Sequence, residues 1–324
     1  MPLYHVKHTT RYEYRSPVTD SANQIILRPQ TSEFQEIKNH RISVSPNVPI
    51  DYFQDYLGNS VGVFTIIQPH SSLEISSELD VLTHPVVLPI SPYSAQEEWK
   101  IVAEKKQEFP YLDFVKSENF ECKSELLDLV HKIARPDLSV METTTLLSSY
   151  IFENFTYKQG VTSIETQIDD IWKLKAGVCQ DFAHLLLELL RLLDIPARYV
   201  SGYISPSDED LRGVGATHAW VEVFIPDYGW LGNDPTNNCW VSDRHIRIAS
   251  GRNFSDCTPV KGTYKGTSSH TLTVLVVITN EQNKHENAEP IAPTYVSEVV
   301  HEEVVGNLNS YQAFLEMQQQ QQQQ

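Results

Sequence analysis

The sequence predicts an α+β protein: an N-terminal antiparallel β-sandwich-like domain, followed by a second domain that combines helices with strands. Three patterns along the chain predict this class. Residues 1–90 consist of short alternating runs separated by turn residues, which is typical of antiparallel strands. Residues 95–193 carry apolar side chains mostly at helical spacing, and residues 200–278 return to strand-like runs.

The first domain is predicted to span residues 1–90. Tyr4, Val6 and His8 alternate with polar neighbours, and the turn residues of 55–60 lie between two apolar runs, as in a hairpin. This density of short strands favours a sandwich. Residues 85–92 are rich in proline and are interpreted as a linker.

The second domain is predicted to span residues 91–279. Ser139 and Glu142 have the spacing of a capping box, and Thr166 with Asp169 is expected to cap a further short helix. Residues 271–278 form a final strand pattern that can pack on either domain. The tail, residues 280–324, is acidic, ends in a run of glutamines and is expected to be flexible.

Charge and hydropathy limit the partners of the chain. With a net charge of −17 at pH 7, the protein is not expected to bind nucleic acid or anionic membranes. Solubility explains the acidic surface, although a preference for basic substrates stays open. The chain has no apolar run long enough to span a membrane, and residues 1–7 lack a signal-peptide pattern. We therefore expect a cytoplasmic protein.

Cysteine usage fits the same compartment. The four cysteines, Cys122, Cys179, Cys239 and Cys257, form no CxxC pair, which argues against a zinc ribbon and predicts no metal site. Cys239 and Cys257 could bridge, and the sequence leaves their pairing open. Thiols are the default in a reducing cytoplasm.

Cys179 begins the stretch around which the second domain is organised. It lies in the first turn of a predicted helix of about 15 residues, whose apolar stripe is Phe182, Leu185, Leu186, Leu189, Leu190 and Leu193. Pro196 prevents the helix from continuing. A helix N-terminus carries orphan N–H groups and a partial positive charge, which favour a thiolate. Asp181 in the same turn opposes this effect, so the site needs a positive partner.

His218 and Asp234 are the candidates for that partner and for the group that orients it. His218 opens an alternating run, and Asp234 follows a short strand pattern. A Cys–His pair needs a third group to fix the imidazole tautomer. Taken singly, each residue has a plainer explanation: an inert core cysteine, a structural strand histidine, and a turn aspartate before proline.

Four segments around these residues resemble the transglutaminase-like cysteine enzymes, which have a papain-like layout. They are 177–183 (GVCQDFA), 195–203 (IPARYVSGY), 217–220 (THAW) and 234–236 (DPT). Segments 8–14, 27–30, 55–59 and 243–256 resemble a bacterial branch in which a β domain precedes the catalytic domain. The resemblance implies a transglutaminase-like α+β catalytic domain with Cys179 as nucleophile, His218 as base and Asp234 as orienting group.

The resemblance further implies cysteine-dependent acyl transfer on a peptide, protein or amide substrate through a thioester. We expect a cysteine protease or amidase, in which water resolves the thioester. Two alternatives stay open: a protein-glutamine transglutaminase that uses an amine, and a peptide-binding module without activity. Gln180, Tyr157 and Trp220 are weaker candidates for oxyanion or substrate contacts. No cofactor is expected, because the sequence contains no calcium loop that would justify the calcium dependence of animal relatives.

Two further segments allow more than one interpretation. His245 is interpreted as structural, with a role in a cleft left open. Residues 205–215 are polar and suit a loop at the mouth of a cleft, with a plain hairpin loop as the equal alternative. The sequence leaves the substrate, the role of the β domain and the oligomeric state open.

Overall fold

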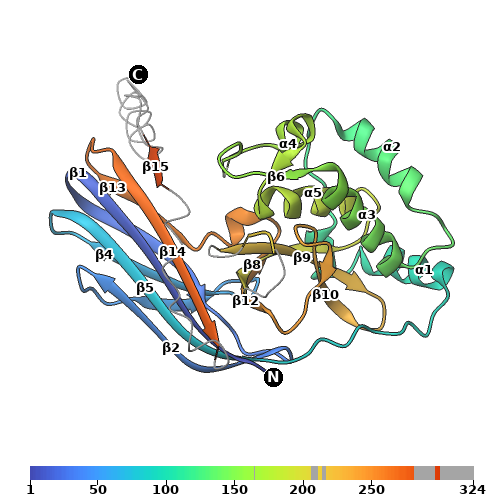
Figure 1. Ribbon diagram of the computed structural model, residues 1–324, viewed down its shortest axis with the longest axis horizontal. Coiled ribbons are helices and arrows are strands. Elements are labelled where there is room, and N and C mark those ends of the chain that lie inside the picture. The colour runs from blue at the N-terminus through green and yellow to red at the C-terminus, as the bar shows by residue number, and fades with distance from the viewer. Residues whose placement is uncertain (164, 206–210, 214–216, 281–295, 300–324) are drawn as a thin grey trace, which may run out of the picture.

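The fold consists of a large N-terminal sheet, a group of helices and a smaller sheet between them. It is seen in a computed structural model, which describes residues 1–163, 165–205, 211–213, 217–280 and 296–299. Figure 1 shows the long strands on the left, the helices on the right, and β8, β9, β10 and β12 between them. The α+β class and the order of its two parts are as predicted.

The N-terminal sheet has eight strands and is built on one very long strand, β1 (Leu3–Arg28). The first half of β1 pairs antiparallel with β5 (His70–Thr83) and β14 (His270–Asn280). Its second half pairs with β4 (Ser60–Ile66) and β13 (Val260–Lys265). The last strand pattern, which the sequence analysis allowed to pack on either domain, is β14. It is hydrogen-bonded to β1 and so belongs to the N-terminal sheet.

Three further strands complete this sheet: β2 (Gln35–Ser45) beside β5, β3 (Asp51–Gln54) beside β4, and β15 (Val296–Val299) beside β14. The register of β1 shifts between Glu13 and Val18, so the strand bends and the sheet curls. Its inner face buries Val18, Ile25, Leu73 and Ile75, among others. Apart from Asn280 and β15, the predicted tail lies outside the described residues.

The helices follow the linker. They are α1 (Ala95–Lys105), the 3₁₀ turn η1 (Tyr111–Phe114), α2 (Lys123–Ile133), α3 (Val140–Asn154), α4 (Ile168–Leu174) and α5 (Cys179–Arg191). The capping box of Ser139 and Glu142 is present at α3. The predicted cap at Thr166 is wrong: α4 begins after Gln167 without a side-chain cap. Asp169 instead accepts backbone N–H bonds from Glu121 and Cys122, a tertiary contact that competes with capping.

The smaller sheet is antiparallel, in the order β11-β10-β9-β8-β12. Its strands are β8 (Ala197–Ile204), β9 (His218–Ile225), β10 (Gly229–Asp234), β11 (Cys239–Trp240) and β12 (His245–Gly251), and the 3₁₀ turn η2 (Phe254–Asp256) follows. Helix α5 packs against β9 and β8. Its apolar stripe is fully buried from Phe182 to Leu190, whereas Leu193 lies beyond the helix and is partly buried. The helix has 13 residues rather than about 15.

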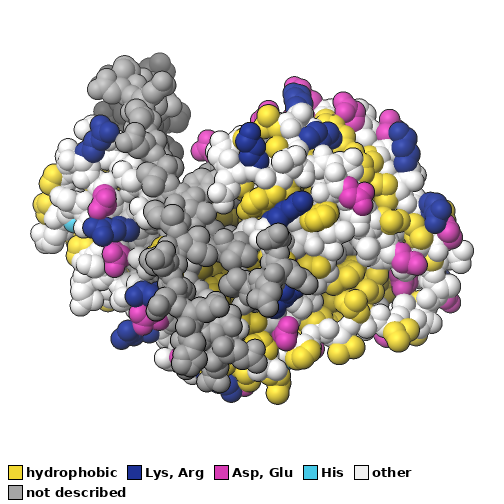
Figure 2. All heavy atoms as spheres, viewed as in Figure 1, with side chains coloured by type: hydrophobic (Ala, Val, Ile, Leu, Met, Phe, Trp, Pro, Cys, Tyr) yellow, Lys and Arg dark blue, Asp and Glu magenta, His cyan; other side chains and the backbone are white. Residues whose placement is uncertain are grey.

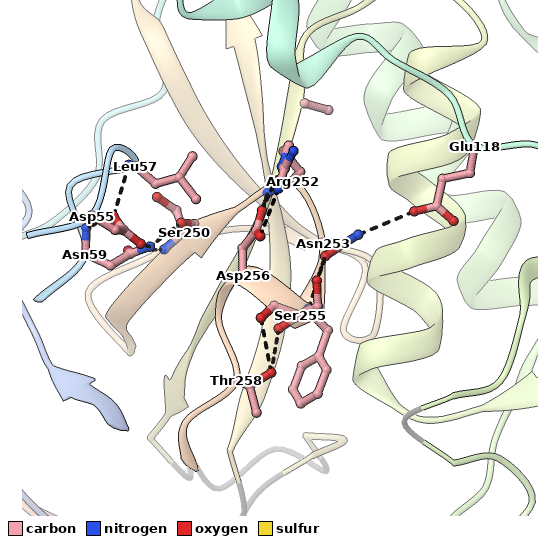
Figure 3. A network of polar contacts seen from close by, with 12 residues as sticks. Asp55, Leu57, Asn59, Glu118, Ser250, Arg252, Asn253, Ser255, Asp256 and Thr258 are labelled. Atoms are coloured by element: carbon pink, nitrogen blue, oxygen red, sulfur yellow. Dashed lines mark hydrogen bonds and ion pairs between the residues drawn. The ribbon is translucent and has the colours of Figure 1, made fainter. Parts of the chain in front are cut away.

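Side chains of the N-terminal sheet bind the outer edge of β12. The Gln35 amide donates to the carbonyl of Arg247 and accepts its N–H, at 2.8 and 2.9 Å. The Asn59 amide makes the same pair of bonds to Ser250, at 2.8 and 2.9 Å, and Figure 3 shows Asn59 facing Ser250, with Asp55 behind it. Two side-chain amides thus take the place of a neighbouring strand along this edge.

The face of the molecule in Figure 2 carries interspersed basic and acidic side chains. All four cysteines lie in the described part of the chain, and no disulfide joins them. Over the residues that the structure describes, no helix has the length and apolarity needed to cross a membrane.

Candidate active site

Cys179 lies at the start of α5, and its neighbours fix the path of the chain into the helix. Strand β7 (Ala176–Gly177) pairs in parallel with β6 (Thr156–Tyr157) immediately before it. The Asp181 carboxylate accepts bonds from the Val178 N–H at 2.7 Å and from the Thr162 hydroxyl at 2.6 Å. Asp181 therefore acts as a local anchor of the helix start.

Gly177 is required by this anchor. A Cβ at Gly177 would lie 2.6 Å from an Asp181 carboxylate oxygen, closer than any real contact allows. Burial raises the pKa of Asp181, although its two hydrogen bonds act in the opposite direction. Asp181 thus lies in the first turn of α5, as predicted, and its effect on a Cys179 thiolate stays a prediction.

His218 begins β9 and is almost completely buried beside Cys179. The Cys179 thiol lies 3.9 Å from the carbonyl oxygen of Thr217, and it interacts directly with the His218 imidazole. Nε2 of His218 is 2.8 Å from Oδ2 of Asp234. Nδ1 has no hydrogen-bond partner of good geometry among the described residues, so it is the ring nitrogen left for a proton exchanged with sulfur or substrate.

Asp234, at the end of β10, is fully buried and receives several donors. Besides His218, Oδ2 accepts the Asn237 side-chain amide at 2.8 Å, and Oδ1 accepts the Thr236 N–H at 2.9 Å. Burial raises the pKa of Asp234, but the His218 charge and hydrogen bond outweigh it and hold the pKa well below its usual range. Burial likewise lowers the pKa of His218, and the Asp234 carboxylate overcomes this and raises it to about 10.

His245 joins the same carboxylate. Its Nε2 lies 3.4 Å from Oδ2 of Asp234, and its Nδ1 faces the Ser242 N–H at 3.2 Å. The sequence interpretation of His245 as structural, with a role in a cleft left open, did not predict this contact. The only available signal was the resemblance of segment 243–256 to the bacterial branch.

Two imidazoles and a carboxylate within 4.8 Å of one another have the composition of a zinc donor set. Here, however, both Nε2 atoms of His218 and His245 approach the same Asp234 oxygen at hydrogen-bond distances. Protons on the two rings satisfy all three groups, and we describe the cluster as a proton network.

The weaker candidates differ in their positions. A Cβ at Gly213, where φ is +83°, would lie 2.7 Å from His218 Nδ1 and 3.6 Å from the Tyr157 hydroxyl. Tyr157 and Gly213 therefore flank the free nitrogen of His218. Gln180 follows Cys179 in α5 and is half-buried. Contacts of these side chains with a substrate stay predictions.

Trp220 lies on β9, two residues after His218, and the centroids of the two rings are 6.2 Å apart. A Cβ at Gly202 would lie 2.6 Å from the indole, so a glycine there is needed to admit the ring, whereas a Cβ at Gly232 would clash with Val241 and lie 3.2 Å from the indole nitrogen. The indole also packs edge-on against His245, with ring centroids 5.3 Å apart. This packing is what the structure shows for Trp220, and its predicted substrate contact is untested.

Much of the predicted loop over residues 205–215 lies outside the described residues. The described part is tied to the site, because the Asn237 amide accepts the Arg212 N–H at 2.9 Å and donates to its carbonyl at 3.3 Å. The same amide binds Asp234. The backbone that leads to Gly213 is thus coupled to the buried carboxylate.

Comparisons with known proteins agree with this fold. Residues 4–82 match the bacterial transglutaminase-like N-terminal region, and residues 128–235 match the transglutaminase-like superfamily. An uncharacterized protein of Mycobacterium tuberculosis is 33% identical over 280 residues, which cover 80% of this chain and 86% of that protein. The chain therefore belongs to the transglutaminase-like superfamily and carries its bacterial N-terminal region.

Two further proteins are similar, one over a short segment of sequence and one in fold. The protein-glutamine gamma-glutamyltransferase of Pseudomonas aeruginosa is 35% identical over 98 residues, or 28% of this chain and 15% of that protein. The crystal structure of a candidate cysteine protease from Cytophaga hutchinsonii has a TM-score of 0.68 at 22% identity, and covers 91% of this chain and 94% of that one. The latter likeness supports the fold.

Proposed function

We propose that the protein is a cysteine protease or amidase that cleaves a peptide or amide bond through a thioester on Cys179. One observation carries the proposal: the Asp234–His218 pair is buried and hydrogen-bonded at 2.8 Å, with the other ring nitrogen left beside Cys179. A raised pKa of about 10 keeps His218 protonated at neutral pH. A protonated imidazole is the positive partner that a nucleophilic thiolate needs.

The reaction then follows from these atoms. Sγ of Cys179 attacks the carbonyl carbon, and the oxyanion is stabilised by backbone N–H groups in the first turn of α5. His218 donates the Nδ1 proton to the leaving nitrogen as the C–N bond breaks, which leaves a thioester. A water molecule gives a proton back to Nδ1 and attacks the thioester, and the C–S bond breaks. Tyr157 is the candidate for a side-chain donor to the oxyanion.

Hydrolysis is preferred over transfer for a physical reason. Water reaches any thioester from which the first product has left, whereas transfer requires a site that holds an amine at high effective concentration. The glutamyltransferase relative supports protein-glutamine transglutamination as the alternative. A peptide-binding module without turnover is the third possibility. The cytoplasmic location and the division at residues 90 and 279 stay predictions.

The test is capture of the thioester by mass spectrometry after incubation with a library of peptides and isopeptides, with and without a labelled primary amine. We expect an acyl adduct on Cys179 in the wild type and in Cys239→Ser, a matched control at a half-buried thiol. Cys179→Ala is expected to lose the adduct and essentially all cleavage.

The outcomes separate the three functions. Label incorporated into product in place of hydrolysis would indicate the transglutaminase. Peptide binding without turnover, equal in wild type and Cys179→Ala, would indicate the binding module. Unchanged cleavage by Cys179→Ala would refute the proposed mechanism.

A further inference from the structure

We propose that His245 is a positioning residue, which donates a second imidazole N–H to the Asp234 oxygen that holds His218 and thereby fixes the carboxylate in place. This inference rests on the proposed function in one respect: the proposed function gives His218 its catalytic role. The hydrogen-bond network itself consists of His245 on β12, Asp234 on β10 and His218 on β9.

The tautomer of His245 follows from its two neighbours. The Ser242 backbone N–H points at Nδ1, at 3.2 Å, and a backbone N–H can only donate. Nδ1 must therefore accept, and the proton of a neutral ring resides on Nε2. Nε2 faces Oδ2 of Asp234 at 3.4 Å, so the bond runs from His245 to the carboxylate. It is longer than the bond from His218 and is the weaker of the two.

His245 is suited to stay neutral. The titratable and charged groups that face it are Asp234, His218 and Arg244. Burial lowers the pKa of His245, and Asp234 opposes this without cancelling it. The centroids of the two rings are 6.3 Å apart, and the rings have different roles. His218 carries the positive charge that pairs with Asp234. His245 donates a hydrogen bond while neutral, so it adds no second charge that would compete for the carboxylate.

The ring of His245 is also held rigidly. Trp220 packs against it edge-on, with an interplanar angle of 77°. Its backbone is paired with Ile204 of β8, and its N–H donates to the Ser242 carbonyl at 3.1 Å. A donor fixed in this way restricts rotation of the Asp234 carboxylate about its χ2 bond, and so keeps Oδ2 directed at His218.

The experiment is an NMR titration of the His218 imidazole in the full-length protein, labelled with ¹⁵N-histidine and assigned with His218→Gln. In the wild type we expect a midpoint near 10. His245→Leu removes the donor and is expected to lower this midpoint by about half a pH unit or more. His245→Gln retains an N–H of similar reach and is expected to recover about half of the shift.

His184→Leu is the matched control, because His184 is a partly buried histidine of α5 that accepts a hydrogen bond from the Phe254 N–H instead of facing Asp234. It is expected to leave the midpoint unchanged. An unchanged midpoint in His245→Leu, or equal shifts in the Leu and Gln variants, would overturn the proposal. If His245→Leu does not fold, His245→Asn replaces it, since its shorter amide cannot reach Asp234, and equal midpoints for Asn and Gln would refute the role.

Alkylation by iodoacetamide keeps this question separate from the proposed function. The rate at Cys179 in the wild type at pH 6, compared with the other three cysteines, tests the nucleophile. Equal rates with a shifted His218 midpoint would refute the acyl-transfer function and still support the positioning role of His245. Faster alkylation of Cys179 than of the other cysteines, with an unchanged His218 midpoint in His245→Leu, would support the acyl-transfer function and refute the positioning role of His245.

Discussion

At the scale of single residues, Asp234 is the side chain on which the polar contacts of the candidate site converge. Its Oδ2 accepts bonds from the His218 ring and the Asn237 side-chain amide, and its Oδ1 accepts the Thr236 N–H, at a position with no solvent exposure. A buried carboxylate is costly unless it is paired and fully hydrogen-bonded. The imidazolium of His218 supplies the charge, which explains why the two pKa values move in opposite directions.

This pairing predicts how stability depends on pH. The folded pKa of His218, about 10, lies above its unfolded value of about 6.5, so the stabilisation is complete below about pH 6.5 and is lost as the pH rises toward 10. The lowered pKa of Asp234 acts at the other end, where stabilisation is lost only as the pH falls below about 4.

We therefore expect the free energy of unfolding of the wild type, relative to His218→Gln, to decrease between pH 6.5 and pH 10, by up to about 1.4 kcal/mol per pH unit. Denaturant titrations at a series of pH values measure it. His184→Gln is the control, because burial lowers the pKa of His184 to about 4 and the residue is neutral throughout this range. A flat difference for His218→Gln would contradict the ion pair.

At the scale of elements, α5 and its first turn decide where the sulfur lies. The helix is buried along most of its length, so its position is set by packing against β9 and β8. Its first residue is set by the local anchor of Asp181, Val178 and Thr162. The geometry of Cys179 thus depends on a polar contact between Val178 and Asp181, which lie on either side of it in the chain.

Asp181→Ala is expected to lower the free energy of unfolding by about 1–3 kcal/mol and to slow alkylation of Cys179, because the first turn loses its fixed path. The control is Ser139→Ala, which removes the cap of α3 and is expected to cost about 1 kcal/mol without changing the alkylation rate. Chemical unfolding and timed iodoacetamide labelling measure the two effects. Equal alkylation rates in both variants would show that Asp181 does not position the thiol.

At the scale of the whole molecule, side chains of the N-terminal sheet contact β12 and β8, two strands of the smaller sheet. Its Gln35 and Asn59 side chains bind the backbone of β12 at Arg247 and Ser250. A further contact, between His8 of β1 and the hydroxyl of Tyr203 on β8, is 2.8 Å long. These contacts fall on β12, which carries His245, and on its neighbour β8, which gives this sheet a supporting role at the candidate site.

Gln35→Leu and Asn59→Leu are each expected to lower the free energy of unfolding by about 1–3 kcal/mol, since each leaves a buried backbone N–H and carbonyl without partners. The specific readout is hydrogen exchange, which should accelerate at the Arg247 amide in the first variant and at the Ser250 amide in the second. Asn39→Ala, on the exposed side of β2, is the control. Unchanged exchange at both amides would show that the Gln35 and Asn59 side chains do not hold the backbone of β12 in place.

The sequence by itself determined the α+β class and the three residues of the candidate site. Each of these depends on a local signal: the apolar period that starts at Cys179, the alternating run that starts at His218, and the turn that follows Asp234. The capping box at Ser139 is local for the same reason. The cap expected at Thr166 does not form, because the Asp169 carboxylate accepts hydrogen bonds from the backbone N–H groups of residues 121 and 122 instead.

Only the tertiary structure decided which side chains meet. The contact of His245 with Asp234 arises because β12 pairs with β8 in the register that sets His245 opposite Ile204. The amides of Gln35 and Asn59 reach β12 across 212 and 191 positions of the chain. Register and domain docking are fixed by packing between segments far apart in the sequence, and no local pattern of residue types encodes them.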